Sequence, residues 1–225
     1  MSPSKPRFEN ISVISTLALK GVLDAAAPGL RAEFHATQAL LKDIAAGKSA
    51  DVVILTEEGI RELSQKNFLV PGTEMKLGRS GDGLAVRAGA AKPDISTLEA
   101  LKKTLVSVDS VGHSRMGASG LYFAGLLERL GLADRLKKRV IVDKGPVAAG
   151  VASGEIRLGA QLLCELAPVK GIDIVGPLPD EVQKFYSFSA AVMAKAANEQ
   201  GAKAFLDFLR TDAVRAEMKR NYLQP

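Results

Sequence analysis

Short apolar runs alternate with amphipathic stretches along almost the whole chain. Apolar or β-branched runs of strand length occupy residues 10–14, 30–35, 50–56, 84–88, 104–109, 139–143, 157–164, 171–179 and 185–193. Apolar residues recur at helical spacing in residues 17–23, 39–46, 57–65, 97–103, 119–130, 146–153, 200–209 and 212–220. This alternation predicts an α/β fold with mostly parallel sheets flanked by helices. The unbroken run 50–56 is typical of a central strand that is buried on both faces.

One glycine-rich turn opens directly into a helix and has the composition of an anion-binding site. Gly117 and Gly120 let the backbone approach a ligand closely, Ser119 can cap the helix, and Gly131 ends it. The free N–H groups of a first helical turn carry partial positive charge toward whatever lies there. A capped helix start without any ligand is an equally good interpretation of these residues.

Small or polar residues stand at four turns from a strand to a helix. These turns are Ser15–Thr16, Thr37–Gln38, Ala118–Ser119 and Pro146–Val147. Ligands of parallel α/β sheets bind outside the carboxyl ends of the strands, so convergence of the turns would point four helix N-termini at one ligand. The residues that we predict to bind a small anion at these turns are Ser15, Thr16, Thr37, Ala118, Ser119 and Val147. The alternative is that the hydroxyls are helix caps that face solvent.

Two arginines stand beside turns that we expect to line the same site. Arg79 and Ser80 begin the glycine-rich stretch 79–83, and Arg115 lies just before Gly117. A guanidinium suits a carboxylate ligand because it donates two parallel hydrogen bonds. Each arginine is about equally well explained as a surface residue, and Arg79 with Ser80 as the anchor of a turn.

A base for proton transfer is less evident in the sequence. His113 lies in the turn before the glycine-rich helix and could move a proton near neutral pH. Glu165, Asp109 and His35 are further candidates, although capping and ion pairing explain such residues more simply. The single Cys164 stands in an apolar run, which indicates a buried bystander rather than a nucleophile.

Composition and charge narrow the classes of function. The 225 residues are 47% hydrophobic and carry a formal net charge of +5, with the lysines and arginines spread along the chain. This spread argues against a nucleic-acid partner. Because no apolar run approaches the roughly 20 residues of a membrane span, we expect no membrane insertion. The absence of a metal-ligand cluster, a nucleotide-binding motif or a catalytic triad predicts neither a metal nor a cofactor.

The order of these segments from Ile11 to Leu223 resembles the type II periplasmic solute-binding proteins, specifically the molybdate-binding-protein-like group. The phrases that carry the resemblance are Ser15–Thr16, Thr37 with residues 41–47, residues 50–55, residues 117–120 with 127–131, and residues 175–179. The resemblance implies two α/β lobes joined by two crossings, with a small anion in the cleft between them. We place lobe one at residues 1–84 plus 190–225 and lobe two at 85–189.

The same resemblance implies an ABC-transporter-type substrate-binding protein that delivers its ligand to a transporter permease. We expect such a protein to be a monomer. Near the strand 157–164, where the molybdate proteins place a tyrosine, this chain has Gln161-Leu162, which argues against molybdate and leaves a small carboxylate as well as an oxyanion. The group also includes aconitate isomerase. The alternative function is therefore an isomerase of a small polycarboxylate such as aconitate, working in the same cleft with His113 as its base.

The cellular compartment that we predict depends on the first residues of the sequence. The chain begins with Met1 and a polar leader to Arg7, without the long apolar segment of a secretory signal. We therefore expect a cytoplasmic protein. A mature form from which an export signal has been trimmed would instead be periplasmic and could meet a permease.

Overall fold

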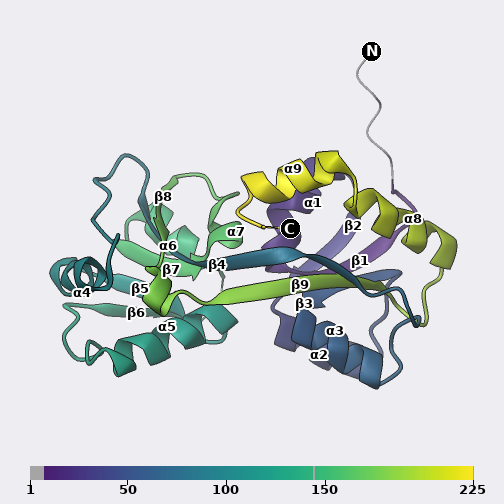
Figure 1. Cartoon of the computed structure of the whole chain (residues 1–225), viewed down its shortest axis with the longest axis horizontal. Coiled ribbons are helices and arrows are strands. Elements are labelled where there is room, and N and C mark those ends of the chain that lie inside the picture. Colours follow the sequence, from purple (N-terminus) through teal and green to yellow (C-terminus); the bar gives the residue numbers. More distant parts are fainter. Residues whose placement is uncertain (1–7, 144, 225) are drawn as a thin grey trace, which may run out of the picture. The chain divides into compact units, whose positions relative to one another are not determined.

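The computed structural model describes residues 8–143 and 145–224 and divides into two compact units (Figure 1). Unit 1 comprises Met1–Arg79 with Tyr186–Pro225, and unit 2 comprises Ser80–Phe185. The chain passes from one unit to the other inside two strands, β4 (Met75–Arg87) and β9 (Phe185–Val192). The boundaries expected from the sequence, after residues 84 and 189, fall within these same strands. The polar leader of residues 1–7 lies outside the described residues.

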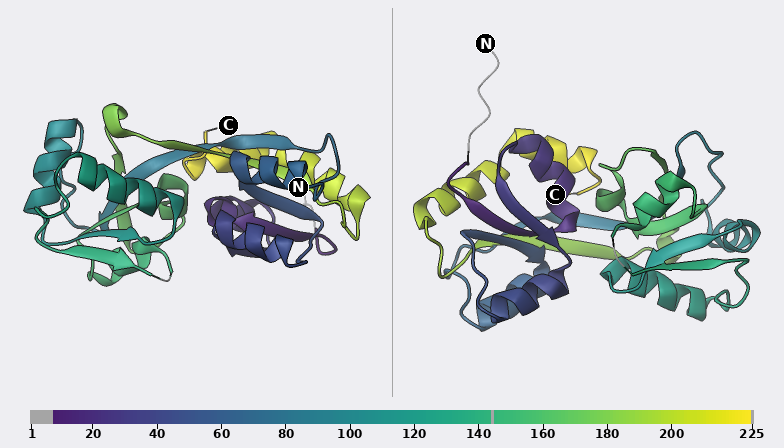
Figure 2. Two further views of the ribbon diagram at one scale, coloured as in Figure 1. Left: turned by 90° about the horizontal axis from the view of Figure 1, so that it is seen from below. Right: turned by 180° about the vertical axis from the view of Figure 1, so that it is seen from behind.

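Unit 1 is a sheet with helices on both faces. Its remaining elements are β1 (Ser12–Thr16), η1 (Leu17–Leu19), α1 (Lys20–Ala26), β2 (Arg31–His35), α2 (Thr37–Ala45), β3 (Val52–Thr56), α3 (Glu57–Gln65), α8 (Glu199–Leu209) and α9 (Asp212–Arg220). The strand order is β2-β1-β3-β9, with β9 antiparallel to β3 and the other pairs parallel. Helices α2 and α3 cover one face, and α1, α8 and α9 cover the other (Figures 1 and 2).

The core of unit 1 explains why residues 50–56 read as an unbroken apolar run. Strand β3 lies between β1 and β9, and its Val52, Val53, Ile54 and Leu55 are fully buried. Because both faces of the strand are covered by helices, successive side chains all point into apolar surroundings. The prediction of a central strand buried on both faces is therefore confirmed.

Unit 2 is built in the same way on a second sheet. Its remaining elements are α4 (Leu98–Ser107), β5 (Val111–Ser114), α5 (Ala118–Arg129), β6 (Arg139–Val142), α6 (Val147–Ser153), β7 (Leu158–Leu162), α7 (Leu163–Leu166), β8 (Ile172–Pro177) and η2 (Asp180–Val182). Strands β7, β5 and β6 are parallel in that order, and β4 pairs antiparallel with β7 and β8. One core cluster of unit 2 joins α4 and α5 to the sheet around Phe123.

The expected strand at residues 104–109 is wrong, because α4 continues to Ser107. Leu101 and Leu105 are both fully buried, as the helical spacing of four residues requires. Strand β5 begins only at Val111, so His113 lies inside a strand rather than in a turn. A short apolar run fits a buried helix and a buried strand equally well, which is why the pattern was ambiguous.

The glycine-rich residues 79–83 come just before the strand expected at 84–88, and the structure makes them part of the same strand. They lie in the middle of β4, where Gly83 pairs with Gln161 of β7. A Cβ atom on Gly83 would stand 2.2 Å from Cδ2 of Leu163, so the glycine is needed for close packing of a neighbouring helix start. Among the described residues no helix is long and apolar enough to cross a membrane.

Candidate functional site

In unit 1, three parallel strands end side by side and each leads directly into a helix. Thr16 of β1 lies beside His35 of β2, and Ser15 pairs with Ile54 of β3. Helices therefore start at residues 17, 37 and 57 along one edge of the sheet. This edge is where the ligands of parallel α/β sheets bind. We call it the strand-end edge of unit 1.

Ser15 and Thr16 present their hydroxyls differently at this edge. Ser15 is fully buried, and its Oγ donates a hydrogen bond to the carbonyl of Thr16 at 2.9 Å. Thr16 is 5% exposed and precedes η1 without capping it. Its hydroxyl makes no hydrogen bond within the part of the chain that the structure describes, and it is not sealed from solvent. Thr16 is therefore the hydroxyl that a ligand can engage without breaking an existing bond.

Thr37 and Thr56 form a pair at the same edge. The backbone N–H of Thr56 donates to Thr37 Oγ1 at 3.5 Å, and Thr56 caps α3 by accepting from the N–H of Gly59. Thr56 was not predicted, although a threonine between an apolar run and two acidic residues is a recognisable cap signal. Glu57 and Glu58 occupy the first turn of α3. Their charges make this third helix start unfavourable for an anion.

In unit 2, the glycine-rich turn leads from β5 into α5, but Ser119 does not cap the helix. Gly117 is the N-cap residue, and its N–H donates to Ser114 Oγ at 3.2 Å. Ser119 is the second helical residue and is 7% exposed. Its hydroxyl makes no hydrogen bond within the described ranges and is not sealed from solvent. Ser119 thus resembles Thr16: a hydroxyl available at a helix start.

The two glycines of this turn serve the packing of the helix on its own strand. A Cβ atom on Gly117 would lie 2.6 Å from Ser114 Oγ, and one on Gly120 would lie 2.1 Å from the Ser114 carbonyl oxygen. Such distances are far inside van der Waals contact. The close approach that we assigned to a ligand is therefore already made by Ser114.

His113 is buried in β5 with both ring nitrogens engaged. Its Nδ1 lies 3.0 Å from the Ser114 carbonyl, and its Nε2 accepts from Nε of Arg139 at 2.9 Å. These partners assign the proton to Nδ1, because only a donor suits a carbonyl. Burial, followed by the charges of Arg139 and Arg115, lowers the pKa of His113 below its ordinary value of 6.5. In this arrangement His113 has no free lone pair for a substrate proton.

The two predicted arginines lie in different settings. Arg115 is exposed, and its Nε donates to Asp143. Arg79 pairs through its backbone with Gln224 of unit 1, and its side chain lines a pocket in that unit. The neighbouring Ser80 belongs to unit 2, where its Oγ accepts from the N–H of Cys164 at 3.2 Å. Ser80 is thus a buried cap of α7.

A polar network at the end of β7 joins three elements of unit 2. Gln161 Oε1 accepts from the N–H of Ala148 in the first turn of α6 at 3.1 Å, and its Nε2 donates to Glu165 Oε2 at 2.7 Å. Val147 itself is buried in a cluster with Val151 and Ile156, so its side chain is core. Burial raises the pKa of Glu165 above its ordinary value, and the bond from Gln161 opposes this only in part. We noted Gln161 in the sequence, but not that it spans two helix starts.

Of the remaining reactive groups, two are exposed and one is fully buried. Asp109 is exposed and pairs with Lys137 at 3.2 Å, and His35 is exposed on β2. Cys164 is fully buried, and burial raises the pKa of its thiol far above the ordinary range, so it is not a nucleophile. Among residues 8–143 and 145–224, no group of three or more His, Cys, Asp and Glu is placed to hold a metal ion.

The amino-acid sequence is similar to those of known proteins. The family model described as bacterial extracellular solute-binding protein matches residues 29–223. An aconitate isomerase from a Pseudomonas species is 34% identical over 222 residues, which cover 92% of this chain and 84% of that protein.

Solved structures share the fold at lower sequence identity. The periplasmic molybdate-binding protein of Azotobacter vinelandii matches with a TM-score of 0.76 at 19% identity, covering 96% of this chain and 99% of that one. A periplasmic thiamin-binding protein matches with a TM-score of 0.63 at 17% identity, covering 100% and 85%. One of these relatives is named for an anion and the other for a cation, so the shared fold alone does not set the charge of a ligand.

Proposed function

Because the chain belongs to the bacterial extracellular solute-binding protein family, we propose that it binds a small anion, with small di- and tricarboxylates as the preferred class. The observation that carries this proposal is the Ser119 hydroxyl, which stands unengaged on the first turn of α5. A hydroxyl on the first turn of a helix is suited to an anion, because the helix dipole is positive there. The 34% identical aconitate isomerase favours a polycarboxylate over molybdate.

Titration calorimetry with cis-aconitate, trans-aconitate, citrate, molybdate, tungstate and sulfate tests the proposal. A hydrogen bond to a charged group contributes about 1.5–3 kcal/mol, so Ser119→Ala should weaken carboxylate binding about tenfold or more. The matched control is Ser153→Ala, which removes an exposed hydroxyl that donates to the carbonyl of Gly150 and accepts from the N–H of Glu155. Equal affinity of the wild type and Ser119→Ala would rule out the start of α5 as the binding site.

The biological role of ligand binding depends on the cellular compartment in which the protein lies. A periplasmic form would deliver its solute to an ABC transporter permease, whereas a cytoplasmic form would use the site for chemistry or storage. We propose a cytoplasmic location. Fractionation of the native organism, with immunoblotting of periplasmic and cytoplasmic extracts, tests this; recovery in the periplasmic extract would overturn it.

A second function, isomerisation of a small polycarboxylate, is favoured by the identity to aconitate isomerase. The reaction needs a base that removes a proton from a carbon next to the double bond and returns it at another carbon as the double bond shifts. No redox partner is required. We propose Glu165 for this role in place of His113, because His113 has both ring nitrogens engaged. Burial raises the pKa of Glu165, and a carboxylate with a higher pKa is a stronger base.

Proton NMR of cis-aconitate and trans-aconitate incubated with the protein tests the second function. Interconversion should occur with the wild type and fall at least a hundredfold in Glu165→Gln, as expected when a general base is lost. The variant should still bind substrate, because Gln161 can donate equally well to an amide oxygen. Conversion by Glu165→Gln at the wild-type rate would exclude Glu165, and no conversion by the wild type would leave a binding protein.

A further inference from the structure

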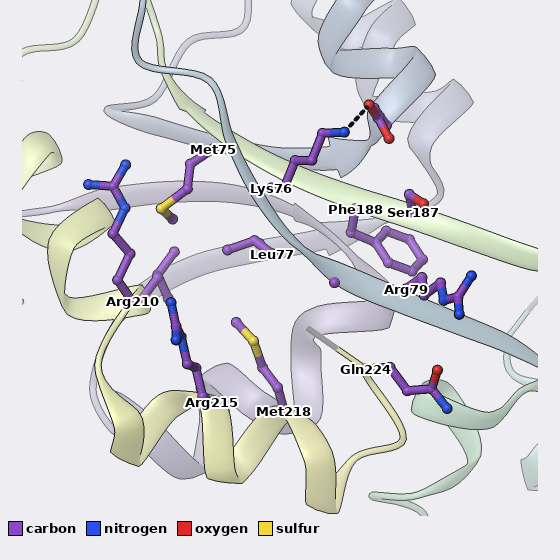
Figure 3. Close-up of a pocket in the computed structure, with 13 residues that line it drawn as sticks. Met75, Lys76, Leu77, Arg79, Ser187, Phe188, Arg210, Arg215, Met218 and Gln224 are labelled. Carbon is purple, nitrogen blue, oxygen red and sulfur yellow. Dashed lines mark ion pairs between the residues drawn. The ribbon is translucent and has the colours of Figure 1, made fainter.

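A pocket of about 310 Å³ lies entirely within unit 1, between the crossing strands and the C-terminal helices (Figure 3). Its walls come from β4, β9, α8 and α9, together with Glu57 of α3 and Gln224 near the C-terminus. The strand-end hydroxyls of Thr16 and Thr37 do not line it. Its volume is at the lower end of the range of roughly 300–1,000 Å³ that is typical of small-molecule sites.

The floor of the pocket is apolar and adaptable. Met75 and Leu77 from β4, Phe188 from β9 and Met218 from α9 are each at most 6% exposed. Figure 3 shows Leu77 between Met75 and Phe188 in this view, with Met218 below them. Two of the four are methionines, whose unbranched thioether chains adjust to the shape of an apolar ligand. The floor therefore favours a hydrocarbon group rather than a compact polar ion.

The rim of the pocket is strongly cationic. Four of the lining side chains are basic, namely Lys76, Arg79, Arg210 and Arg215, whereas Glu57 is the one acidic side chain in the lining. Arg210 and Arg215 reach in from the helices on one side, and Arg79 stands on the other (Figure 3). The resulting field attracts anions.

The basic residues of the rim differ in whether an acidic side chain already forms an ion pair with them. Glu57 pairs with Lys76 at 3.3 Å, and Arg210 pairs with Asp207 at 3.0 Å. Arg215 makes no ion pair with any residue that the structure describes. An unpaired guanidinium beside an apolar floor is suited to bind a carboxylate through two parallel hydrogen bonds.

From this combination we propose that unit 1 carries a second ligand site, which binds an amphipathic monocarboxylate. The carboxylate is held by Arg215, and the hydrocarbon tail lies on Met75, Leu77 and Met218. A compact polycarboxylate lacks the tail that this floor requires, so the site is distinct from the one proposed above for citrate-like anions. Its test is independent of that function.

Titration calorimetry with octanoate as the probe tests the site. Octanoate should bind saturably with one site per chain, butyrate should bind at least tenfold more weakly because it buries less apolar surface, and octylamine should not bind because its charge is repelled. Saturating cis-aconitate should leave the octanoate affinity unchanged. No octanoate binding, tight octylamine binding or competition by cis-aconitate would each overturn the proposal.

Two variants of α9 locate the carboxylate. Arg215→Gln should weaken octanoate binding about tenfold, the effect of losing a charged hydrogen-bonded pair. The matched control is Arg220→Gln on the same helix, because Arg220 pairs with Glu217 and does not line the pocket. Equal loss in both variants would show that only net charge matters, and unchanged affinity in Arg215→Gln would remove the anchor; either result overturns the assignment.

Discussion

Ser15 and Thr16 show how two neighbouring hydroxyls take different roles. The Ser15 hydroxyl donates a hydrogen bond to the carbonyl of Thr16, whereas the Thr16 hydroxyl makes no hydrogen bond within the described chain. Side-chain direction alternates along a strand, so only one of two successive residues can face the same partner. A polar pair at a strand end therefore does not reveal which of its two hydroxyls is left without an internal partner.

This difference predicts unequal effects of two substitutions. Thr16→Val keeps the shape of the side chain and removes no internal hydrogen bond of the described chain, so it should change the free energy of unfolding by less than about 0.5 kcal/mol. Ser15→Ala should lower the free energy of unfolding by about 1 kcal/mol, the typical contribution of one internal hydrogen bond. Urea unfolding measures both effects. A larger loss of stability in Thr16→Val would reverse the assignment.

Glu165 makes stability depend on pH in a direction that can be tested. Burial raises its pKa above the ordinary value of 4.5, so above pH 4.5 the unfolded state binds fewer protons than the folded state. The free energy of unfolding therefore falls as the pH rises, until Glu165 ionises in the folded protein, by about 1.4 kcal/mol for each unit of pKa difference.

Glu165→Gln should remove this dependence. Relative to the wild type, the variant should gain stability at pH 8 compared with pH 5, as measured by urea unfolding at both values. Glu155→Gln is the matched control, because Glu155 is an exposed carboxylate of the same unit. An identical difference at pH 5 and pH 8 would mean that Glu165 titrates in the same way folded and unfolded.

At the level of elements, the start of α5 is positioned by contact with the end of β5. The Ser114 hydroxyl accepts from Gly117, and Gly120 lies against the Ser114 carbonyl. The glycines therefore hold the Ser119 hydroxyl in place by letting the helix approach its own strand. The sequence pattern correctly marked the glycines as special, but the partner they approach is the protein itself.

Two glycines of α5 give a matched pair of variants. Gly120→Ala places a Cβ atom 2.1 Å from the Ser114 carbonyl, so the helix start must shift, at a cost of about 1–3 kcal/mol and with weaker anion binding. Gly125→Ala meets nothing nearer than 3.4 Å and should stabilise the helix by roughly 0.5–1 kcal/mol. Thermal unfolding and calorimetry report both. Equal behaviour of the two variants would contradict the packing role of Gly120.

Element assignments from the sequence succeeded where periodicity and end signals agreed. Helix α3 has the bounds that its pattern predicted, and strand β2 differs by one residue. The assignment failed at residues 104–109, where the apolar spacing suits two structures and no glycine or proline marks the end of α4. The strand expected at 84–88 begins earlier, at Met75, because a glycine that is needed for close packing inside a strand does not mark the start of the strand.

At the level of the whole molecule, two separately cored units and a positive net charge set the conditions for binding. A formal net charge of +5 favours anions over long distances, and salt screens this attraction. Affinity for citrate or cis-aconitate should therefore fall several-fold between about 50 and 500 mM NaCl in calorimetric titrations. Affinity that does not change with salt would argue against a charged ligand.

The sequence alone determined the fold class, the family and the edges of the sheets at which polar residues gather. These properties follow from apolar periodicity and from the order of strands and helices, which are local features that a linear pattern records. Tertiary structure decided the use of each side chain. It buried His113 between Arg139 and Ser114, turned Ser80 into a cap for α7 and placed Arg79 in a pocket of unit 1.

The physical reason is that a hydrogen bond or a buried charge depends on a partner that stands far away in the sequence. Gln161 accepts from Ala148, and Ser80 accepts from Cys164, which lies 84 residues further along the chain. Residue type specifies what a side chain can donate or accept, but the packing of the strands and helices selects which partner it meets. Of the hydroxyls that the sequence offered, packing left those of Thr16 and Ser119 unengaged at a helix start.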